Sequence, residues 1–316
     1  MKKLFISFLA MFALSTFAQT VTIATGPTNK GYSNLYKNIK AVCDTSTPME
    51  EKVSEGGLDN ISILTERGAT VGIVPLDVFQ KMQNSDSSIG RFKAVAALNN
   101  NLFHILVNSK GALTEGGCTG KVMGGKCIGM KADNYYKPIN TQADLKGLNV
   151  GLVGSAQLTG RTYIMNAVGD FNPIDYNGPT ADKQAQADLA AGKIQAVITT
   201  SAWPSGAVKD LTQASNLALV PWTAPVSGGY KIIKKNYKKL NALGVPFLAT
   251  PNTLFARPVD PSSDVGQNIT KLKSCIQSNL SKLKNDDGFE PSWDEVDSLM
   301  VSDELSAWGG SIKGKK

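Results

Sequence analysis

The sequence predicts an α/β protein, because short β-branched or apolar runs alternate with amphipathic helical stretches along most of the chain. The first part reads strand–helix three times over, an order that implies a largely parallel sheet. Apolar residues make up 42% and charged residues 19% of the chain, which is enough for a sizeable globular core. A length of 316 residues favours two domains.

The N-terminal residues predict a cleavable secretory signal. Two lysines supply a positive start, residues 4–14 are almost wholly apolar, and the small residues Thr16 and Ala18 suit a signal peptidase. The apolar run is well short of the ~20 residues that a membrane-spanning helix needs. We therefore expect residues 1–18 to be removed and the exported protein to begin at Gln19.

The predicted elements of the first part follow from apolar residues at helical spacing and from β-branched runs. In order, they are a strand at 21–25, a helix carrying Tyr32, Leu35, Tyr36 and Ile39, a strand at 52–54, a helix at 58–67, a strand at 70–75, a helix at 76–82, and two separate strands at 92–97 and 102–107.

Residues 110–137 interrupt this rhythm, because they are rich in glycine and contain two cysteines, and they predict a surface excursion. The α/β pattern then resumes. Its predicted elements are a strand at 148–153, a loop at 154–160, a helix at 161–168, a helix at 182–191, strands at 194–200, 217–221 and 246–255, and a long helix at 264–283.

Four cysteines in an exported chain indicate two disulfides, for which three pairings are possible. Cys118 and Cys127 bracket a glycine-rich loop, which favours a bridge between them and leaves Cys43 to pair with Cys275. A zinc site is the alternative, but the chain has no CxxC spacing and only one histidine, so we expect no metal.

The formal net charge of +7 is partly local. Lys231, Lys234, Lys235, Lys238 and Lys239 form one cluster, and three further lysines lie in the last four residues. A basic cluster can bind nucleic acid or anionic lipid. Since no nucleic-acid-binding motif accompanies it, we interpret the cluster as a solvated helix face and expect no nucleic-acid partner.

Two loops have the composition of a ligand-binding turn. The loops at 26–31 and 154–160 are rich in Gly, Ser and Thr, and each lies between a predicted strand and a predicted helix. A helix N-terminus offers free N–H groups and a partial positive charge, which suit a carboxylate or a phosphate. Each loop alone is also compatible with an ordinary βα turn, but two of them suggest a ligand held between two lobes.

Several segments in collinear order resemble the TAXI-type solute receptors of TRAP transporters. Residues 68–78 read GATVGIVPLDV, similar to the family pattern G-x-A-D-x-G-I-V-Q-S-D-V, with Pro75 and Leu76 in place of Gln and Ser. The excursion at 110–137 and the cysteines are not part of the family pattern. The other matching segments are 21–26 with 31–32, 92–98 with 102–107, 143–147 with 154–155, and 249–257.

The resemblance implies a two-lobed type II periplasmic binding protein fold with mixed, mostly parallel sheets and a ligand cleft between the lobes. Lobe 1 would comprise 19–107 and 206–316, and lobe 2 would comprise 108–205 with the insertion at 110–137. Carried over by position, the ligand-binding residues would be Gly26, Thr28, Gly31, Tyr32, Val74, Asp77, Ser155, Gln157, Thr159, Arg161, Ser201 and Trp203.

The resemblance further implies a role for particular residues. Tyr32 and Trp203 would close over the apolar part of the ligand, and Arg161, at the predicted helix start, would capture a carboxylate through two hydrogen bonds. The implied function is a periplasmic receptor that captures a small anionic or zwitterionic solute, an amino acid or organic acid, and delivers it to the membrane subunits of a TRAP transporter. We expect no cofactor. We expect a monomer.

Three other classes of protein are alternatives to this interpretation. A serine hydrolase needs a catalytic histidine, but His104 lies in an apolar run typical of a core residue, and Ser155 lacks the G-x-S-x-G elbow, so we expect no enzyme. A binding protein of an ABC importer, for a thiamine precursor or a phosphonate, would share the implied fold. An envelope interaction protein that has lost the cleft would use the excursion and the basic cluster as contact surfaces.

Overall fold

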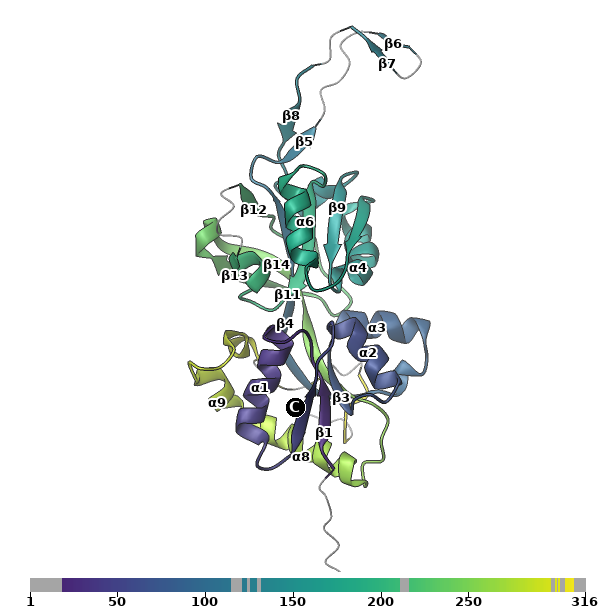
Figure 1. Cartoon of the computed structure of the whole chain (residues 1–316), viewed down its shortest axis with the longest axis vertical. Helices are drawn as coiled ribbons and strands as arrows, with labels where there is room; N and C mark the ends of the chain where they lie inside the picture. The colour runs from purple at the N-terminus through teal and green to yellow at the C-terminus, as the bar shows by residue number, and fades with distance from the viewer. Residues whose placement is uncertain are drawn as a thin grey trace, which may run out of the picture.

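The computed structural model describes residues 19–114, 121–123, 126–129, 132–210, 216–296, 299, 301 and 305–309. The predicted signal at residues 1–18 and the C-terminal lysines lie outside these residues. Two α/β lobes are stacked along the longest axis, with strands running from one into the other (Figure 1). No helix in the described residues is long and apolar enough to cross a membrane.

The first lobe is built from both ends of the chain. Its elements are β1 (Val21–Ala24), α1 (Gly31–Cys43), β2 (Met49–Lys52), α2 (Gly57–Thr65), β3 (Val71–Pro75), α3 (Leu76–Ser85), η1 (Ile89–Arg91), α8 (Asp264–Ser278), α9 (Leu280–Asn285) and η6 (Pro291–Glu295).

The second lobe is built from the middle of the chain. Its elements are η2 (Gln142–Leu145), β9 (Asn149–Val153), α4 (Ala156–Thr159), the π-helical turn η3 (Gly160–Ile164), α5 (Met165–Val168), β10 (Asn172–Tyr176), α6 (Ala181–Ala190), β11 (Ala196–Ser201), α7 (Gly206–Asp210), β12 (Leu217–Leu219), β13 (Lys231–Tyr237) and η5 (Lys238–Leu240).

Two long strands, β4 (Lys93–Asn108) and β14 (Ala242–Ala256), belong to both lobes. They pair antiparallel along most of their length, and β3 joins β14 in lobe 1 while β11 joins β4 in lobe 2. Within the described residues this gives one ten-stranded sheet, in which eight strands follow the path β10-β9-β11-β4-β14-β3-β1-β2, while β12 pairs with β4 and β13 with β14. The pairing is parallel within β2-β1-β3 and β10-β9-β11. The two long strands therefore form the connection on which the lobes can hinge.

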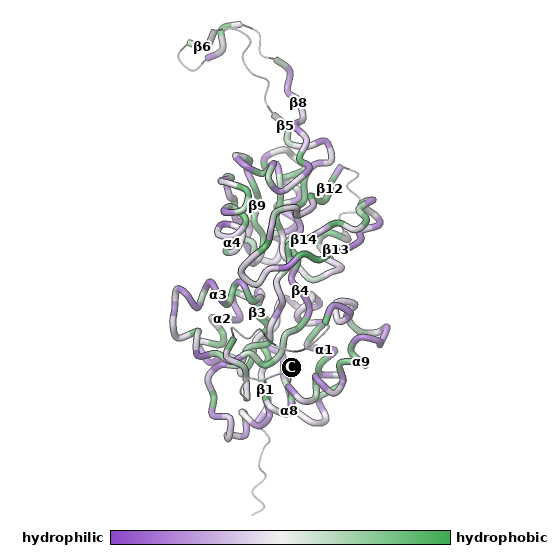
Figure 2. Tube along the Cα trace, turned by 180° about the vertical axis from the view of Figure 1, so that it is seen from behind, coloured by the Kyte–Doolittle hydropathy of each residue, from purple (hydrophilic) through white to green (hydrophobic). Residues whose placement is uncertain are grey.

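Each lobe buries both faces of its part of the sheet, as period-two alternation predicts. In lobe 1, Ile23 and Ile73 face a core shared with α1 and α8, whereas Ala24 and Val74 face a core shared with α2 and α3. Lobe 2 repeats this plan with one core under α4 and α5 and another under α6. The strands in the interior of both lobes are the most hydrophobic segments (Figure 2).

The structure differs from the expected elements at the long strands. The two strands expected at 92–97 and 102–107 are one strand, β4, because the intervening Asn99, Asn100 and Asn101 find partners within the fold and continue the pairing. Figure 2 shows this segment as a hydrophilic stretch between two hydrophobic ones. The strand expected at 52–54 ends at Lys52, and the helix expected at 264–283 is divided in two at Asn279.

The interpretation of the basic cluster as a helix face is wrong. Lys231, Lys234 and Lys235 lie in β13, an edge strand paired with β14, and Lys238 begins the short turn η5. The strand forms because its side chains alternate in exposure and it ends on the buried Tyr237. Strands β12 and β13 pack on the second lobe. The chain therefore returns to lobe 1 within β14 and not directly after residue 205, the boundary that the sequence predicts.

The glycine-rich excursion forms an arm that extends from the second lobe (Figure 1). Its base is the pair β5 (Ala112–Thr114) and β8 (Tyr135–Lys137), and further out lie β6 (Lys121–Met123) and β7 (Lys126–Ile128). Gly111 has a φ of 101°, and a Cβ there would collide with the carbonyl oxygen of Lys137, so only glycine lets the base close. The expected Cys118–Cys127 bridge lies outside the described residues.

The expected Cys43–Cys275 disulfide is confirmed. It joins the last residue of α1 to α8, with 5.8 Å between the Cα atoms and a sequence separation of 232 residues. It therefore ties the N-terminal and C-terminal parts of lobe 1 together.

Candidate functional site

The structure brings about half of the predicted site residues to the facing ends of the two lobes. Gly31 and Asp77 lie at the starts of α1 and α3 in lobe 1. Ser155 precedes α4, and Ser201 ends β11, in lobe 2. A Cβ on Gly31 would lie 4.0 Å from the Cβ of Ala202, so the lobes are in contact across this region. The arrangement arises because loops after parallel strands emerge at the same edge of a sheet.

A chain of buried hydrogen bonds crosses the sheet at the boundary between the lobes. The Tyr32 hydroxyl donates to Asn252 Oδ1 over 2.7 Å, and Asn252 Nδ2 donates to Asn99 Oδ1 over 3.0 Å. Asn99 Nδ2 in turn donates to Ser292 Oγ over 3.0 Å. Asn99 and Asn252 are fully buried, so each would cost free energy without these partners. This chain fixes Tyr32, a predicted site residue, to both crossing strands.

A second polar group faces the first from lobe 2. Asn101 Nδ2 donates to Ser155 Oγ over 3.2 Å, and Ser155 Oγ lies 2.8 Å from Thr200 Oγ1, where either hydroxyl can donate. Ser155 is therefore held by hydroxyl and amide groups, with no acid or histidine within this group. This environment suits polar recognition rather than activation of Ser155 as a nucleophile.

Asp77 links the lobes directly. Its Oδ1 accepts from the Val78 N–H over 2.8 Å, and its Oδ2 accepts from the Tyr230 hydroxyl, in lobe 2, over 3.0 Å. Burial raises the pKa of this carboxyl from its ordinary value of 3.8 to about 6, although these hydrogen bonds and the nearby Thr159 hydroxyl lower the pKa. Tyr230 stacks on Tyr163 with 4.0 Å between the ring centroids, which fixes the partner of Asp77.

Asp77 gives the protein a pH-dependent stability. The folded chain keeps the Asp77 proton up to about pH 6, while the unfolded chain releases it near pH 4, so stability falls as the pH rises through this window. The loss is about 3 kcal/mol by pH 7. We expect urea unfolding to show that the free energy of unfolding of Asp77→Asn rises relative to that of the wild type by nearly that amount as the pH rises from 4 to 7.

The matched control is Asp86→Asn. The Ser88 side chain and N–H lower the pKa of the Asp86 carboxyl, so its contribution changes with pH in the opposite direction. A difference between wild type and Asp77→Asn that stays constant from pH 4 to pH 7 would contradict the assignment.

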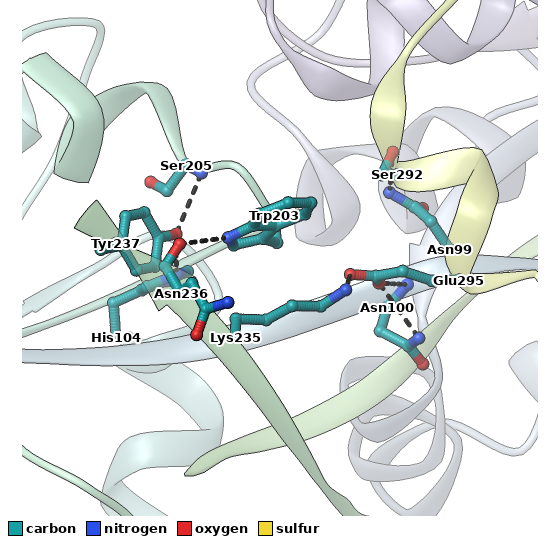
Figure 3. Close-up of polar contacts among 10 residues, drawn as sticks. All are labelled: Asn99, Asn100, His104, Trp203, Ser205, Lys235, Asn236, Tyr237, Ser292 and Glu295. Carbon is teal, nitrogen blue, oxygen red and sulfur yellow. Dashed lines mark hydrogen bonds and ion pairs between the residues drawn. The ribbon is translucent and has the colours of Figure 1, made fainter. Parts of the chain in front are cut away.

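A lysine connects the lobes on the other side of the crossing strands (Figure 3). Lys235 Nζ from β13 lies 2.6 Å from Glu295 Oε1 of η6 in lobe 1, and Glu295 Oε2 accepts from the backbone and side-chain nitrogens of Asn100. Lys235 Nζ also lies 4.5 Å from the centroid of the Trp203 ring, whose Nε1 donates to the Asn236 carbonyl. Trp203 is thus held by this contact, in a loop next to α1.

His104 is a core residue, as its apolar surroundings predict. It is fully buried, its Nε2 lies 2.7 Å from the Tyr237 hydroxyl, and its Nδ1 lies 3.5 Å from Ser201 Oγ. The Tyr237 hydroxyl also accepts from the Ser205 N–H (Figure 3). Burial lowers the pKa of His104 from its ordinary value of 6.5 to about 3. The ring is therefore a neutral partner that positions Tyr237.

Some predicted residues lie away from this region. The helix expected to begin at Arg161 begins at Ala156, and Arg161 Nη2 pairs instead with Asp175 Oδ2 at 2.6 Å on the surface. Gln157 donates to the Tyr176 carbonyl, and Val74 is fully buried in the core under α2 and α3. Thr28 is exposed. Gly26 and Thr159 lie next to site residues but behind them, Gly26 against the Tyr32 ring and Thr159 buried beside Asp77.

Sequence reasoning missed several residues that the fold places at the site. They are Asn99, Asn100, Asn101, Tyr230, Lys235, Asn252 and Glu295. Only the asparagine run gave a signal, because three consecutive amides between two apolar runs are unusual in a strand. Tyr230 and Asn252 are brought to the site by contacts with residues 153 positions away, and Lys235 meets Glu295 through a pairing between the two lobes.

The described residues of the site offer neutral hydroxyls and amides, the carboxyl of Asp77, and the ion pair of Lys235 with Glu295. Among the residues that the structure describes, no group of histidine, cysteine and acidic side chains is arranged to hold a metal ion. Such a lining can hold and orient a polar solute.

No protein-family model and no curated protein sequence matches the chain. The crystal structure of Tv2483 bound to L-arginine aligns with a TM-score of 0.51 and 9% identity, over 87% of this chain and 90% of that one. A TctC solute-binding protein from Polaromonas aligns with a TM-score of 0.48 and 14% identity, over 87% and 85%. An ancestral arginine-binding protein bound to arginine aligns with a TM-score of 0.44 and 16% identity, over 87% and 95%. The chain has the type II periplasmic binding protein fold, and at these identities the similarity concerns the fold alone.

Proposed function

We propose that this protein is an extracytoplasmic receptor that holds a small zwitterionic or anionic solute, an amino acid or an organic acid, between its lobes. The observation that carries the proposal is the network of polar side chains that both lobes contribute where they meet: Tyr32 and Asn252 on one side, and Asn101 and Ser155 on the other. Lobes joined by two crossing strands can open and close over such a network, which replaces the water around a polar solute.

Two features of lobe 1 favour a zwitterion. Helix α1 begins at the site with no side-chain cap and no acidic residue in its first turn, so its N–H groups and positive dipole end are suited to a carboxylate. Asp77, with a pKa of about 6, is mostly ionised at pH 7 and suits an ammonium group. An α-amino acid carries both groups on one carbon.

The delivery step follows from the sequence resemblance to the TAXI-type receptors, which serve TRAP transporters in the periplasm, and from the predicted signal at residues 1–18. The alternative is an ABC importer. Co-purification of the full-length protein with its membrane complex from the native host separates them, because a TRAP transporter contributes two membrane subunits without an ATPase.

Isothermal titration calorimetry of the mature protein with amino acids and organic acids tests the binding function. We expect at least one of them to bind. Asn101→Ala should weaken that affinity about tenfold or more, because it removes a donor at the site and leaves Ser155 without this amide. If the ligand is an amino acid, Asp77→Asn should weaken its binding but not that of the matching acid without the amine.

The matched control is Arg161→Ala, whose guanidinium is engaged with Asp175 on the surface and should leave affinity unchanged. The receptor proposal fails if a folded, ligand-free preparation binds no member of the panel. If Arg161→Ala alone abolishes binding, the site lies elsewhere on lobe 2.

A second candidate function, that of an envelope interaction protein, is favoured by the arm. Large apolar side chains are exposed along it: Leu113, Val122, Met123, Ile128, Tyr135 and Tyr136. Exposed apolar side chains concentrated on one projecting segment are typical of a contact surface for another protein.

Deleting the arm tests whether it is separate from the solute site and from the core of the lobes. Ala112 and Lys137 pair directly, so residues 113–136 can be replaced by a short glycine turn. We expect the melting temperature to change by less than about 2 °C, because residues of 113–136 are absent from the described core clusters of both lobes. Solute affinity should also be unchanged. Loss of solute binding on deletion would contradict the separation of the two surfaces, and calorimetry on the same sample measures it.

A further inference from the structure

A second concave site lies in lobe 1, at the end of the sheet opposite the contact between the lobes. A cavity of about 140 Å³ is lined by Arg67, Arg91 and Arg257, together with Thr65, Ser88 and Phe92. Arg67 lies between α2 and β3, Arg91 precedes β4, and Arg257 follows β14. Because the five residues of β3 span roughly 15 Å, this cavity is separate from the site at the other end of that strand.

Among the residues that the structure describes, no carboxylate compensates the charges of this arginine pocket. Three guanidinium groups line it and no acidic side chain does. Among the described residues, none of the three arginines forms an ion pair. The positive charge of Arg91 helps to lower the pKa of the Asp86 carboxyl, but Asp86 makes no ion pair with it, and Asp86 Oδ1 accepts a hydrogen bond from the Ser88 N–H. Guanidinium groups gathered without a counter-charge repel one another unless an anion joins them.

Arg257 is held in place by its neighbours. It is partly buried, its Nε donates to the Ala69 carbonyl over 3.2 Å, and its own N–H donates to the Thr70 carbonyl over 3.1 Å. Burial and the positive charge of Arg67 both lower its pKa. The Nε hydrogen bond fixes the plane of the guanidinium, so its terminal nitrogens are held in place to donate to a ligand.

Arg67 occupies a backbone conformation that glycine would adopt more easily. Its φ is +63°, in the left-handed region, directly after α2 and before Gly68. An arginine there costs about 1 kcal/mol relative to glycine. Strain of this kind is kept where the side chain has a use, and here the side chain lines the pocket.

We propose that the arginine pocket binds a tetrahedral oxyanion, of which phosphate is the representative. Arginine donates hydrogen bonds in pairs to phosphate and sulfate oxygens, and three guanidinium groups can together occupy most of the acceptor positions of one such ion. The cavity greatly exceeds the ~10–15 Å³ needed for one water, so it has room for the ion. The phosphate group can be free in solution or belong to the headgroup of an anionic lipid.

Thermal unfolding and calorimetry of the whole mature protein with inorganic phosphate test the proposal, at an ionic strength held constant with sodium chloride. We expect phosphate to raise the melting temperature and chloride not to. The variant Arg67→Gly/Arg91→Ala should weaken phosphate affinity at least tenfold. Since Arg67→Gly relieves the left-handed strain, this variant should fold well without phosphate.

The matched control is Arg161→Ala, which removes the same type of charge from the surface of lobe 2. Co-sedimentation with phosphatidylglycerol vesicles, compared with phosphatidylcholine vesicles, distinguishes the source of the phosphate group. The proposal is supported if the protein binds inorganic phosphate, or phosphatidylglycerol vesicles alone, and if this binding is abolished in Arg67→Gly/Arg91→Ala and retained in Arg161→Ala. No binding in either arm, or equal loss in both variants, overturns it.

Discussion

Acidification from pH 7 to pH 3 is expected to cost the protein about 4 kcal/mol of stability through His104 alone. The unfolded chain takes up a proton on this histidine near pH 6.5, whereas the buried ring in the folded chain does so only near pH 3. The stabilisation is therefore complete above pH 6.5 and is lost progressively as the pH falls to 3. The cause is burial, since a protonated ring would sit between aromatic side chains of Tyr237 and Phe247.

Because His104 is the only histidine of the chain, its ring can be followed without assignment. Nuclear magnetic resonance of imidazole-labelled protein should show no titration above pH 4 while the protein stays folded. Urea unfolding should show the advantage of the wild type over His104→Gln shrinking by about 3 kcal/mol between pH 6.5 and pH 4. Asp77 acts in the opposite direction between pH 4 and pH 6, and it cancels in this difference because both proteins contain it. A ring that titrates near pH 6.5 in the folded state contradicts the prediction.

Removal of the Cys43–Cys275 disulfide is expected to lower the free energy of unfolding by about 4 kcal/mol. The bridge closes a loop with a sequence separation of 232 residues, so it strongly restricts the unfolded chain. Within the folded chain it joins α1 to α8, which share the core of lobe 1. The double variant Cys43→Ala/Cys275→Ala measures the effect by urea unfolding without a reducing agent, which leaves the other two cysteines as they are.

The control for this experiment is Cys118→Ala/Cys127→Ala, which changes the same number of cysteines in the arm. If this control lowers stability as much as the lobe 1 variant does, or if the lobe 1 variant loses less than about 1 kcal/mol, the assigned role of the bridge is wrong.

Much of the fold was predictable because its elements are set by local patterns. The alternation of apolar residues in β1 and β3 and the helical spacing in α1 place these elements within a few residues of their expected limits. The expectation failed at β4, where a polar run looked like a break between strands. It failed again at β13, where lysines spaced by three and four residues looked like a helix face. Pairing with β14 decided both segments, and for β4 that pairing depends on residues far away in sequence.

The candidate site was predictable to the same extent. The loops after β1, β3 and β9 supplied Tyr32, Asp77 and Ser155, because loops at the ends of parallel strands meet at one edge. Their partners Asn252 and Tyr230 come from strand and loop positions with no local signature. Arg161 was the opposite case, since a different helix start turned its side chain toward Asp175.

The sequence alone determined the α/β class, the position of most helices and strands and the core position of His104, and it favoured the Cys43–Cys275 pairing among three possible ones. These depend on side-chain periodicity, residue type and the number of available partners. Only the tertiary structure decided that β4 and β14 run through both lobes, that Asp77 meets Tyr230, and that three arginines gather around one cavity. Those features arise from packing between distant segments, whose geometry no local pattern contains.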